Sequence, residues 1–139
     1  MPAMTTYRAA VDPSHCDFLG HMNVSRYFAA CSDAVFALQA ELGLTPDDMR
    51  SGRRLSFAVV HAESDFRAEL LAGDLLRMET DIVGIGTKSM SFRHRLYRCP
   101  DETLSFEATF KGVLLSLDTR RAVEVPQELR DRAAAFMAG

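Results

Sequence analysis

The chain has 139 residues, 47% of them hydrophobic, which is the size of one domain that can bury a core. Its formal net charge is −3 and its pI is about 5.8, so it lacks the broad positive charge of a general nucleic-acid binder. The three cysteines are odd in number and widely spaced, which argues against a disulfide framework and favours a reducing compartment.

No apolar stretch approaches the roughly 20 residues that span a bilayer. The opening residues, MPAMTTYRAA, lack the basic and then apolar layout of a signal peptide. We therefore expect one domain over residues 1–139, located in the cytoplasm, with no membrane or nucleic-acid partner.

A long amphipathic pattern follows a short β-like run, TYRAAV, at residues 6–11. Between residues 24 and 42 apolar side chains recur every three or four positions, which predicts a helix with one buried stripe. Asn23 is the expected N-cap, because its side-chain oxygen can accept from a first-turn amide, and Gly43 is the expected stop. The stripe consists of Tyr27, Cys31, Ala34, Val35, Leu38 and Leu42.

Alternating patterns dominate the second half of the chain, after a turn-rich segment at residues 45–54. One long strand is expected at 55–70, and three runs with a period of two follow at 76–82, 90–97 and 104–114. The linkers LAGD, GIGTK and RCPDET are short and rich in Gly, Pro or Asp. Because such linkers join neighbouring strands, we expect the four strands to form a meander.

A short C-terminal helix is predicted from Pro126, with Leu129, Ala133, Phe136 and Met137 on the face that packs against the body. The order of elements favours an α+β fold in which a curved antiparallel sheet wraps around the long central helix. The helix has one apolar stripe and every strand has one apolar face, so this arrangement buries both. The alternative is a helix that lies across an open sheet.

The segment VDPSHCDFLGHMNVSRYFAACSDAVFALQAELGL, residues 11–44, resembles the active-site region of hot-dog-fold acyl-CoA thioesterases of the 4-hydroxybenzoyl-CoA thioesterase type. In that family an Asp, two residues and a Gly precede the central helix, and an aromatic residue follows; Asp17, Gly20 and Tyr27 fall in those places. The resemblance implies a hot-dog enzyme that hydrolyses an acyl-CoA to a carboxylic acid and coenzyme A without a cofactor, with Tyr27 among its substrate contacts. The runs GHM, RYF and LLSLDTRR look similar to thioesterases associated with carnitine dehydrogenase, which would link the chain to betainyl-CoA.

The start of the central helix offers the chemistry that thioester cleavage needs. First-turn amides are unpaired donors at the positive end of the helix dipole, so they can hold a developing oxyanion. We expect the amides of Asn23 and Val24 to do so, and the family's carbonyl-polarising amide maps to Val24. Asp17 is the expected nucleophile or general base, two roles that one sequence does not separate. Gly20 would turn the backbone tightly, and His21 and Asn23 either contact substrate or brace the loop.

Further substrate contacts are expected on the strands. The resemblance places Glu63 and Ser64 in a strand that lines the neighbouring subunit's pocket. Lys88 and Ser89 in the GIGTKS hairpin, with Arg93 on the next strand, are candidates for the phosphates of coenzyme A. The alternative for these three is a solvated edge of the sheet.

Histidine and cysteine residues favour a structural role over a metal site. His15, Cys16 and His21 lack the regular spacing of a zinc motif and have no evident fourth ligand, so no metal is expected. His61 and His94 lie in strand patterns and are expected to be packed, hydrogen-bonded core residues.

Two other functions share the predicted fold. Hot-dog enoyl-CoA hydratases carry an Asp and His pair in a different motif, which DFLGHMN does not reproduce. A non-catalytic acyl-thioester binding protein would keep the fold and the pocket while making Asp17 dispensable. The sequence does not identify the acyl group, because the depth of the pocket depends on side chains from more than one subunit. A single subunit would expose a strand edge and the active-site mouth, so a homodimer or homotetramer is expected.

Overall fold

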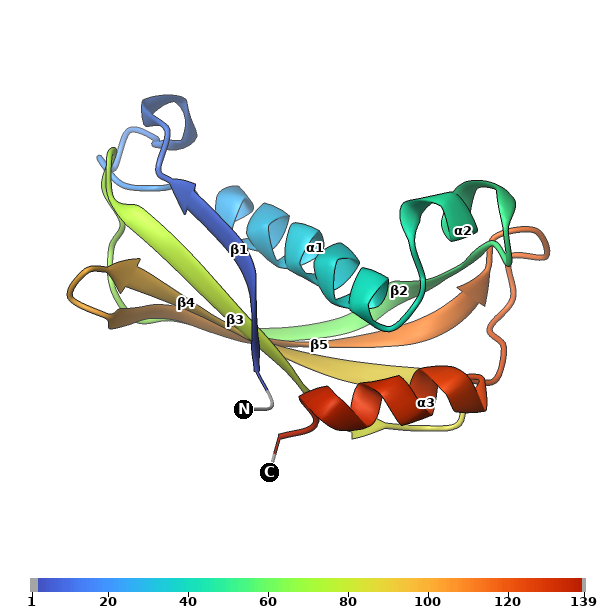
Figure 1. The fold of residues 1–139 in the computed structure, drawn as a ribbon. Helices are drawn as coiled ribbons and strands as arrows, with labels where there is room; N and C mark the ends of the chain where they lie inside the picture. Colours follow the sequence, from blue (N-terminus) through green and yellow to red (C-terminus); the bar gives the residue numbers. More distant parts are fainter. Residues whose placement is uncertain (1–2, 139) are drawn as a thin grey trace.

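An antiparallel sheet that curves around a long helix forms the body of the protein, as a computed structural model describes it for residues 3–138 (Figure 1). The elements are β1 (Met4–Ala10), α1 (Val24–Glu41), α2 (Pro46–Ser51), β2 (Leu55–Phe66), β3 (Leu75–Ile85), β4 (Ser89–Cys99), β5 (Thr103–Ser116) and α3 (Gln127–Ala133). The five strands lie in the order β1-β3-β4-β5-β2. This arrangement confirms the expected hot-dog fold.

The central helix α1 follows its sequence pattern closely. Every residue of the predicted stripe is buried. The side chain of Asn23 caps the helix by accepting from the amide of Ser25 at 3.0 Å. Gly43 follows the last turn with a φ of +98°, a left-handed conformation that glycine adopts without strain.

The order of strands corrects one prediction. Strands β3, β4 and β5 form a meander, as their short linkers predicted, but β2 does not pair with β3. It pairs with β5 instead, from Leu55↔Ser116 to Phe66↔Phe106, at the opposite edge of the sheet from β1. Alternation shows which face of a strand is buried, and it carries no information about which strand lies next to it. The prediction of one meander was therefore wrong.

The short helix α2 was not predicted from the sequence. Thr45 caps α2 by accepting from the amide of Asp48 at 3.2 Å, and Pro46 lies in its first turn. Such a start favours a helix, although we predicted turns here. The C-terminal helix is confirmed as α3. Its Arg130 guanidinium donates to the carbonyls of Gly86 and Thr87 at 2.7 and 3.0 Å, which holds α3 against the β3–β4 hairpin.

The core divides into two clusters along α1. The cluster under the first half of α1 contains Tyr27, Ala30, Cys31, Met78, Leu96 and Phe106. The cluster under the second half contains Leu38, Leu42, Ile82, Phe92, Leu114 and Leu129. Thr80 and His94, which are paired across β3 and β4, lie between the two clusters and are fully buried.

His94 confirms the prediction of a packed core histidine. Its Nδ1 lies 2.8 Å from the hydroxyl of Thr80, which in turn lies 2.8 Å from the hydroxyl of Thr6. Its Nε2 is buried and has no hydrogen-bond partner among residues 3–138. Burial lowers the pKa of His94 to about 4, because a charged imidazole would lose its hydration.

The pKa of His94 predicts a loss of stability in acid. Its folded pKa lies below its ordinary value, so the unfolded chain binds the proton more readily, and stability falls as pH drops from about 6.5 towards 4. We expect the parent to lose about 2 to 3 kcal/mol more than a His94→Gln variant between about pH 7.5 and pH 4.5. Urea unfolding at the two pH values measures the difference, and identical pH dependence in both proteins would contradict it.

Candidate active site

A tight turn at Asp17–Gly20 precedes α1. The amide of Gly20 donates to the carbonyl of Asp17 at 3.0 Å, and the amide of Asp17 donates to the carbonyl of His21 at 3.2 Å. Gly20 has a φ of +85°, which few other residues adopt without strain. The turn that Gly20 predicted is therefore present, and it carries Asp17 back towards the start of the helix.

Asn23 joins Asp17 to the helix terminus. Its side-chain Nδ2 donates to Oδ2 of Asp17 at 2.8 Å, while its Oδ1 caps α1 by accepting from Ser25. The other carboxylate oxygen of Asp17 accepts from the amide of Leu19 at 2.9 Å. Both oxygens of Asp17 are therefore oriented by hydrogen bonds, and one side chain fixes the carboxylate relative to the first turn of α1.

The two amides expected to hold an oxyanion differ in their surroundings. The amide of Asn23 donates to the carbonyl of His15 at 2.9 Å, so it is already occupied. Val24 is the first residue of α1, where a helix leaves its amide without an intrahelical acceptor. Val24 is also about half exposed, at 52%. Of the two expected donors, the amide of Val24 is therefore the one that a ligand could still use.

Hydrogen bonds set the charge state of Asp17. The side chain of Asn23, and then the amide of Leu19, hold the pKa of Asp17 below its ordinary value by stabilising the carboxylate. Asp17 is therefore ionised at neutral pH. A carboxylate in this state can attack a thioester carbonyl, or it can take a proton from a water molecule.

A pocket of about 320 Å³ opens beside the start of α1. It is lined by His21, Met22, Val24, Tyr27, Phe66, Arg67, Ala68 and Glu69. Three of the predicted site residues, His21, Val24 and Tyr27, are thus brought together in one wall. Asp17 is not part of the lining, but Asn23 connects it to the wall residue Val24.

The opposite wall comes from a segment that the sequence pattern assigned to a strand. β2 ends at Phe66, because the amides of both Arg67 and Ala68 turn to the carbonyl of Ser105, at 2.8 and 3.1 Å. The segment then passes the start of α1, where the carbonyl of Leu70 accepts from the amide of Met22 at 2.7 Å. Phe66–Glu69 were missed as site residues, and their alternating pattern gave no signal of this turn.

Two predicted contacts lie on β2, outside this pocket. Glu63 is exposed, and its Oε1 lies 3.1 Å from Nε2 of His61. Ser64 is half-buried. His61 was expected in the core, and this prediction was wrong. β2 is the outer strand of the sheet, and residues 59–63 are exposed on both of its faces.

The candidates for phosphate binding lie far from the pocket within one chain. Lys88 and Ser89 belong to the β3–β4 hairpin, which packs beside α3 at the opposite end of α1 from Val24 (Figure 1). Arg93 is held by Asp81, whose two carboxylate oxygens accept from its guanidinium at 3.1 and 2.6 Å. The structure therefore does not bring these three residues together with the turn at Asp17.

Neither a metal cluster nor a membrane span appears in the part of the chain that the structure describes. No group of three or more His, Cys, Asp or Glu side chains is placed to hold a metal ion there. No helix there is long and apolar enough to cross a bilayer. His21 has a structural contact instead, with Nδ1 3.2 Å from the carbonyl of Met22.

A curved sheet around one helix, with a pocket and a carboxylate at the helix N-terminus, is the arrangement of a hot-dog protein. The model of the Thioesterase-like superfamily matches residues 11–133. The chain belongs to this family, which confirms the predicted resemblance.

Two relatives are similar over most of the chain. The L-carnitine dehydrogenase/betainyl-CoA thioesterase of Agrobacterium fabrum is 32% identical over 125 residues, which are 88% of this chain and 25% of that protein. The chain thus spans about a quarter of that relative's length. The 1,4-dihydroxy-2-naphthoyl-CoA hydrolase of Prochlorococcus marinus is 26% identical over 118 residues, which are 80% of this chain and 77% of that protein.

The fold is also similar to solved structures. A hypothetical protein from Staphylococcus aureus, solved in complex with CoA, superposes with a TM-score of 0.87 at 19% identity. The match covers 98% of this chain and 85% of that one. At this identity the likeness supports the fold alone.

Proposed function

We propose that the protein is an acyl-CoA thioesterase that hydrolyses an acyl-CoA to a carboxylic acid and free coenzyme A. The observation that carries the proposal is the placement of an ionised carboxylate, Asp17, and a helix-terminal amide, Val24, beside one pocket. The names of both relatives describe enzymes that act on CoA thioesters.

In the proposed mechanism the thioester carbonyl points at the amide of Val24. That amide donates to the oxygen as negative charge develops on it, at the positive end of the α1 dipole. Asp17 either attacks the carbonyl carbon or removes a proton from a water molecule that attacks it. In both routes the C–S bond breaks and coenzyme A leaves as the thiolate. In the first route the acyl–aspartyl anhydride that forms is then hydrolysed by water. Asn23 is a positioning residue, because it orients Asp17 and caps the helix that carries the Val24 amide. The acyl group would occupy the pocket.

The two alternative functions predict different behaviour. A binding protein of this fold would hold acyl-CoA intact, and its Asp17 would be dispensable. A hydratase would add water to an enoyl-CoA and release no thiol. Release of free coenzyme A, followed with a thiol reagent, therefore separates the proposed function from both.

We also propose that the chain acts as a homodimer or a larger homo-oligomer. β2 pairs with β5 on one side only, so its outer edge presents unpaired backbone groups. Val59 and Val60 are 48% and 59% exposed in the middle of this strand, and a core-lining strand does not leave both faces open. A second copy pairing along this edge would cover them, and it would bring Glu63 and Ser64 to the partner's pocket.

Light scattering at micromolar concentration tests the assembly. We expect at least twice the mass of one chain, because an open apolar edge strand is unstable in solution. A Val60→Lys variant should shift the protein towards the monomer, since it places a charge in the proposed contact. A monomeric parent would refute the assembly.

Phosphate binding by the β3–β4 hairpin would require a second subunit. Within one chain Lys88, Ser89 and Arg93 lie away from the pocket, so they would bind the phosphates of coenzyme A only if a second subunit brought them there. A cytoplasmic location rests on the odd number and wide spacing of the cysteines.

A further inference from the structure

Glu69 is the unpaired acidic residue of the pocket lining. Its carboxylate has no hydrogen bond or ion pair with any residue in the range 3–138. The other charged residue of the lining, Arg67, lies 3.7 Å from Asp65 and 3.6 Å from Glu107, which balance its charge. The pocket therefore carries a net negative charge at its rim.

Two aromatic rings line the same pocket as Glu69. Tyr27 and Phe66 pack edge to face, with ring centroids 5.1 Å apart and an interplanar angle of 83°. Glu69 raises the pKa of Tyr27, in addition to the larger effect of burial, so its field reaches the phenol. A carboxylate and aromatic rings around one cavity are the chemistry that binds a quaternary ammonium group, which has no hydrogen to donate.

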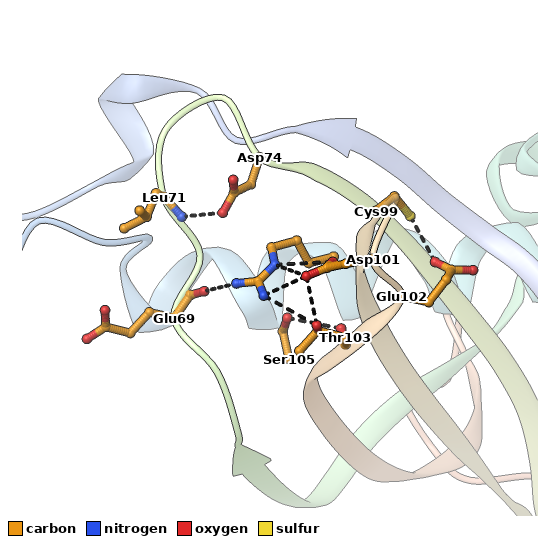
Figure 2. A network of polar contacts seen from close by, with 9 residues as sticks. Glu69, Leu71, Asp74, Cys99, Asp101, Glu102, Thr103 and Ser105 are labelled. Atoms are coloured by element: carbon orange, nitrogen blue, oxygen red, sulfur yellow. Dashed lines mark hydrogen bonds and ion pairs between the residues drawn. The ribbon is translucent and has the colours of Figure 1, made fainter.

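The backbone on either side of Glu69 is anchored at several points. The amides of Arg67 and Ala68 donate to Ser105 just before it, and the carbonyl of Leu70 accepts from Met22 just after it. The carbonyl of Glu69 itself accepts from Nη1 of Arg98 at 3.4 Å. Figure 2 shows this carbonyl turned into a polar network and the Glu69 carboxylate turned away from it.

The network that receives the carbonyl of Glu69 is held by further hydrogen bonds. Asp101 accepts from the guanidinium of Arg98 at 2.8 Å and from the hydroxyl of Thr103 at 3.0 Å (Figure 2). The β4–β5 hairpin thus supports the rim of the pocket. The backbone at Glu69 is therefore fixed before any ligand arrives, which lowers the cost of ordering this residue.

We propose that Glu69 is a specificity-determining residue that selects acyl groups carrying a fixed positive charge, such as a quaternary ammonium. This inference rests on the proposed thioesterase function and names its substrate class. The rings of Tyr27 and Phe66 contact the methyl groups of such a cation, and Glu69 neutralises its charge. A neutral acyl group of the same shape fits the rings but leaves Glu69 unpaired.

Two thioesters of equal shape test the proposal. Betainyl-CoA carries a trimethylammonium group where 3,3-dimethylbutanoyl-CoA carries a tert-butyl group, so the pair differs in charge alone. Each kcat/KM is divided by the uncatalysed hydrolysis rate, because the ammonium group activates its own thioester. We expect the parent to prefer betainyl-CoA by at least about tenfold, and Glu69→Gln to reduce the preference to within about twofold.

A matched control separates a specific effect from a general one. Glu41→Gln removes an exposed carboxylate at the other end of α1, and it should leave the preference unchanged. If Glu69→Gln lowers kcat/KM equally for both thioesters, the proposal is overturned and Glu69 has a structural role. No charge preference in the parent would overturn it as well. A fall in kcat/KM that Glu69→Gln shows only with 1,4-dihydroxy-2-naphthoyl-CoA would also overturn the proposal. Glu69 would then be a hydrogen-bond acceptor for a phenol.

Failure of the thioesterase proposal gives a different result. The parent would then release no thiol from either compound. In that case calorimetric binding of the two intact thioesters makes the same comparison. Tighter binding of betainyl-CoA that depends on Glu69 supports the inference, and equal binding refutes it.

Discussion

A Val24→Pro variant is expected to lose about 100- to 1,000-fold in kcat while it keeps its fold, the effect of deleting one oxyanion donor. Val24 is the first residue of α1, where proline is favoured because the amide has no partner within the helix. Asn23 already has the extended conformation that a residue before proline requires, with φ −69° and ψ 147°. The substitution therefore removes the N–H that the mechanism uses and leaves the helix in place.

Val24→Ala is the matched control for this variant. It shortens the same pocket side chain and keeps the amide, so any loss of packing is common to both proteins. Thiol release gives kcat, and circular dichroism with thermal unfolding verifies the helix. Parental turnover in Val24→Pro would assign the oxyanion to another donor.

Asp17→Asn should lower kcat at least about 100-fold, the size of effect that loss of general-base function alone produces. Asn has nearly the same shape but no negative charge, so it neither attacks a carbonyl nor accepts a proton from water. KM should stay within about threefold, because Asp17 does not line the pocket. The substitution removes one of the hydrogen bonds that Asn23 and Leu19 donate to Asp17, so thermal unfolding is needed to verify that the fold is kept.

Single turnover in heavy-oxygen water separates the two roles of Asp17. Direct attack forms an acyl–aspartyl anhydride, and its hydrolysis at the aspartyl carbonyl places solvent oxygen in the carboxylate of the enzyme. General-base catalysis places solvent oxygen only in the product acid, so label in the enzyme shows direct attack. The lowered pKa of Asp17 adds a second observation, because this group stays ionised as the pH falls towards its ordinary range. A decline in activity between about pH 7 and pH 5 would therefore reflect the protonation of a group other than Asp17.

Local patterns predicted the structure at the start of α1 well. The helix, its Asn23 cap and the turn at Gly20 depend on residues within a few positions of one another, so the sequence carried all three. The same local motif indicated Asp17. The occupied amide of Asn23 was not predictable, because its acceptor, the carbonyl of His15, is set by how the loop folds back.

Long-range contacts account for the features that were missed. Alternation identified the faces of β2 but not its partner β5, and it assigned Arg67–Glu69 to a strand. Those residues form a pocket wall because the amides of Arg67 and Ala68 both find Ser105, a contact between distant parts of the chain. The exposure of His61 has the same origin, since a pattern with a period of two does not show which strand lies at the edge.

The most direct test of the account is the rate of coenzyme A release by the parent and by Asp17→Asn, measured together on betainyl, dihydroxynaphthoyl and short-chain thioesters. If Asp17 is the catalytic carboxylate, the parent turns over at least one of them, and Asp17→Asn does so at least about 100-fold more slowly. Near-parental turnover by Asp17→Asn would contradict the account and point to another catalytic residue, such as Glu63. Binding of every thioester without release of thiol would contradict it as well, and would make the protein a binding module.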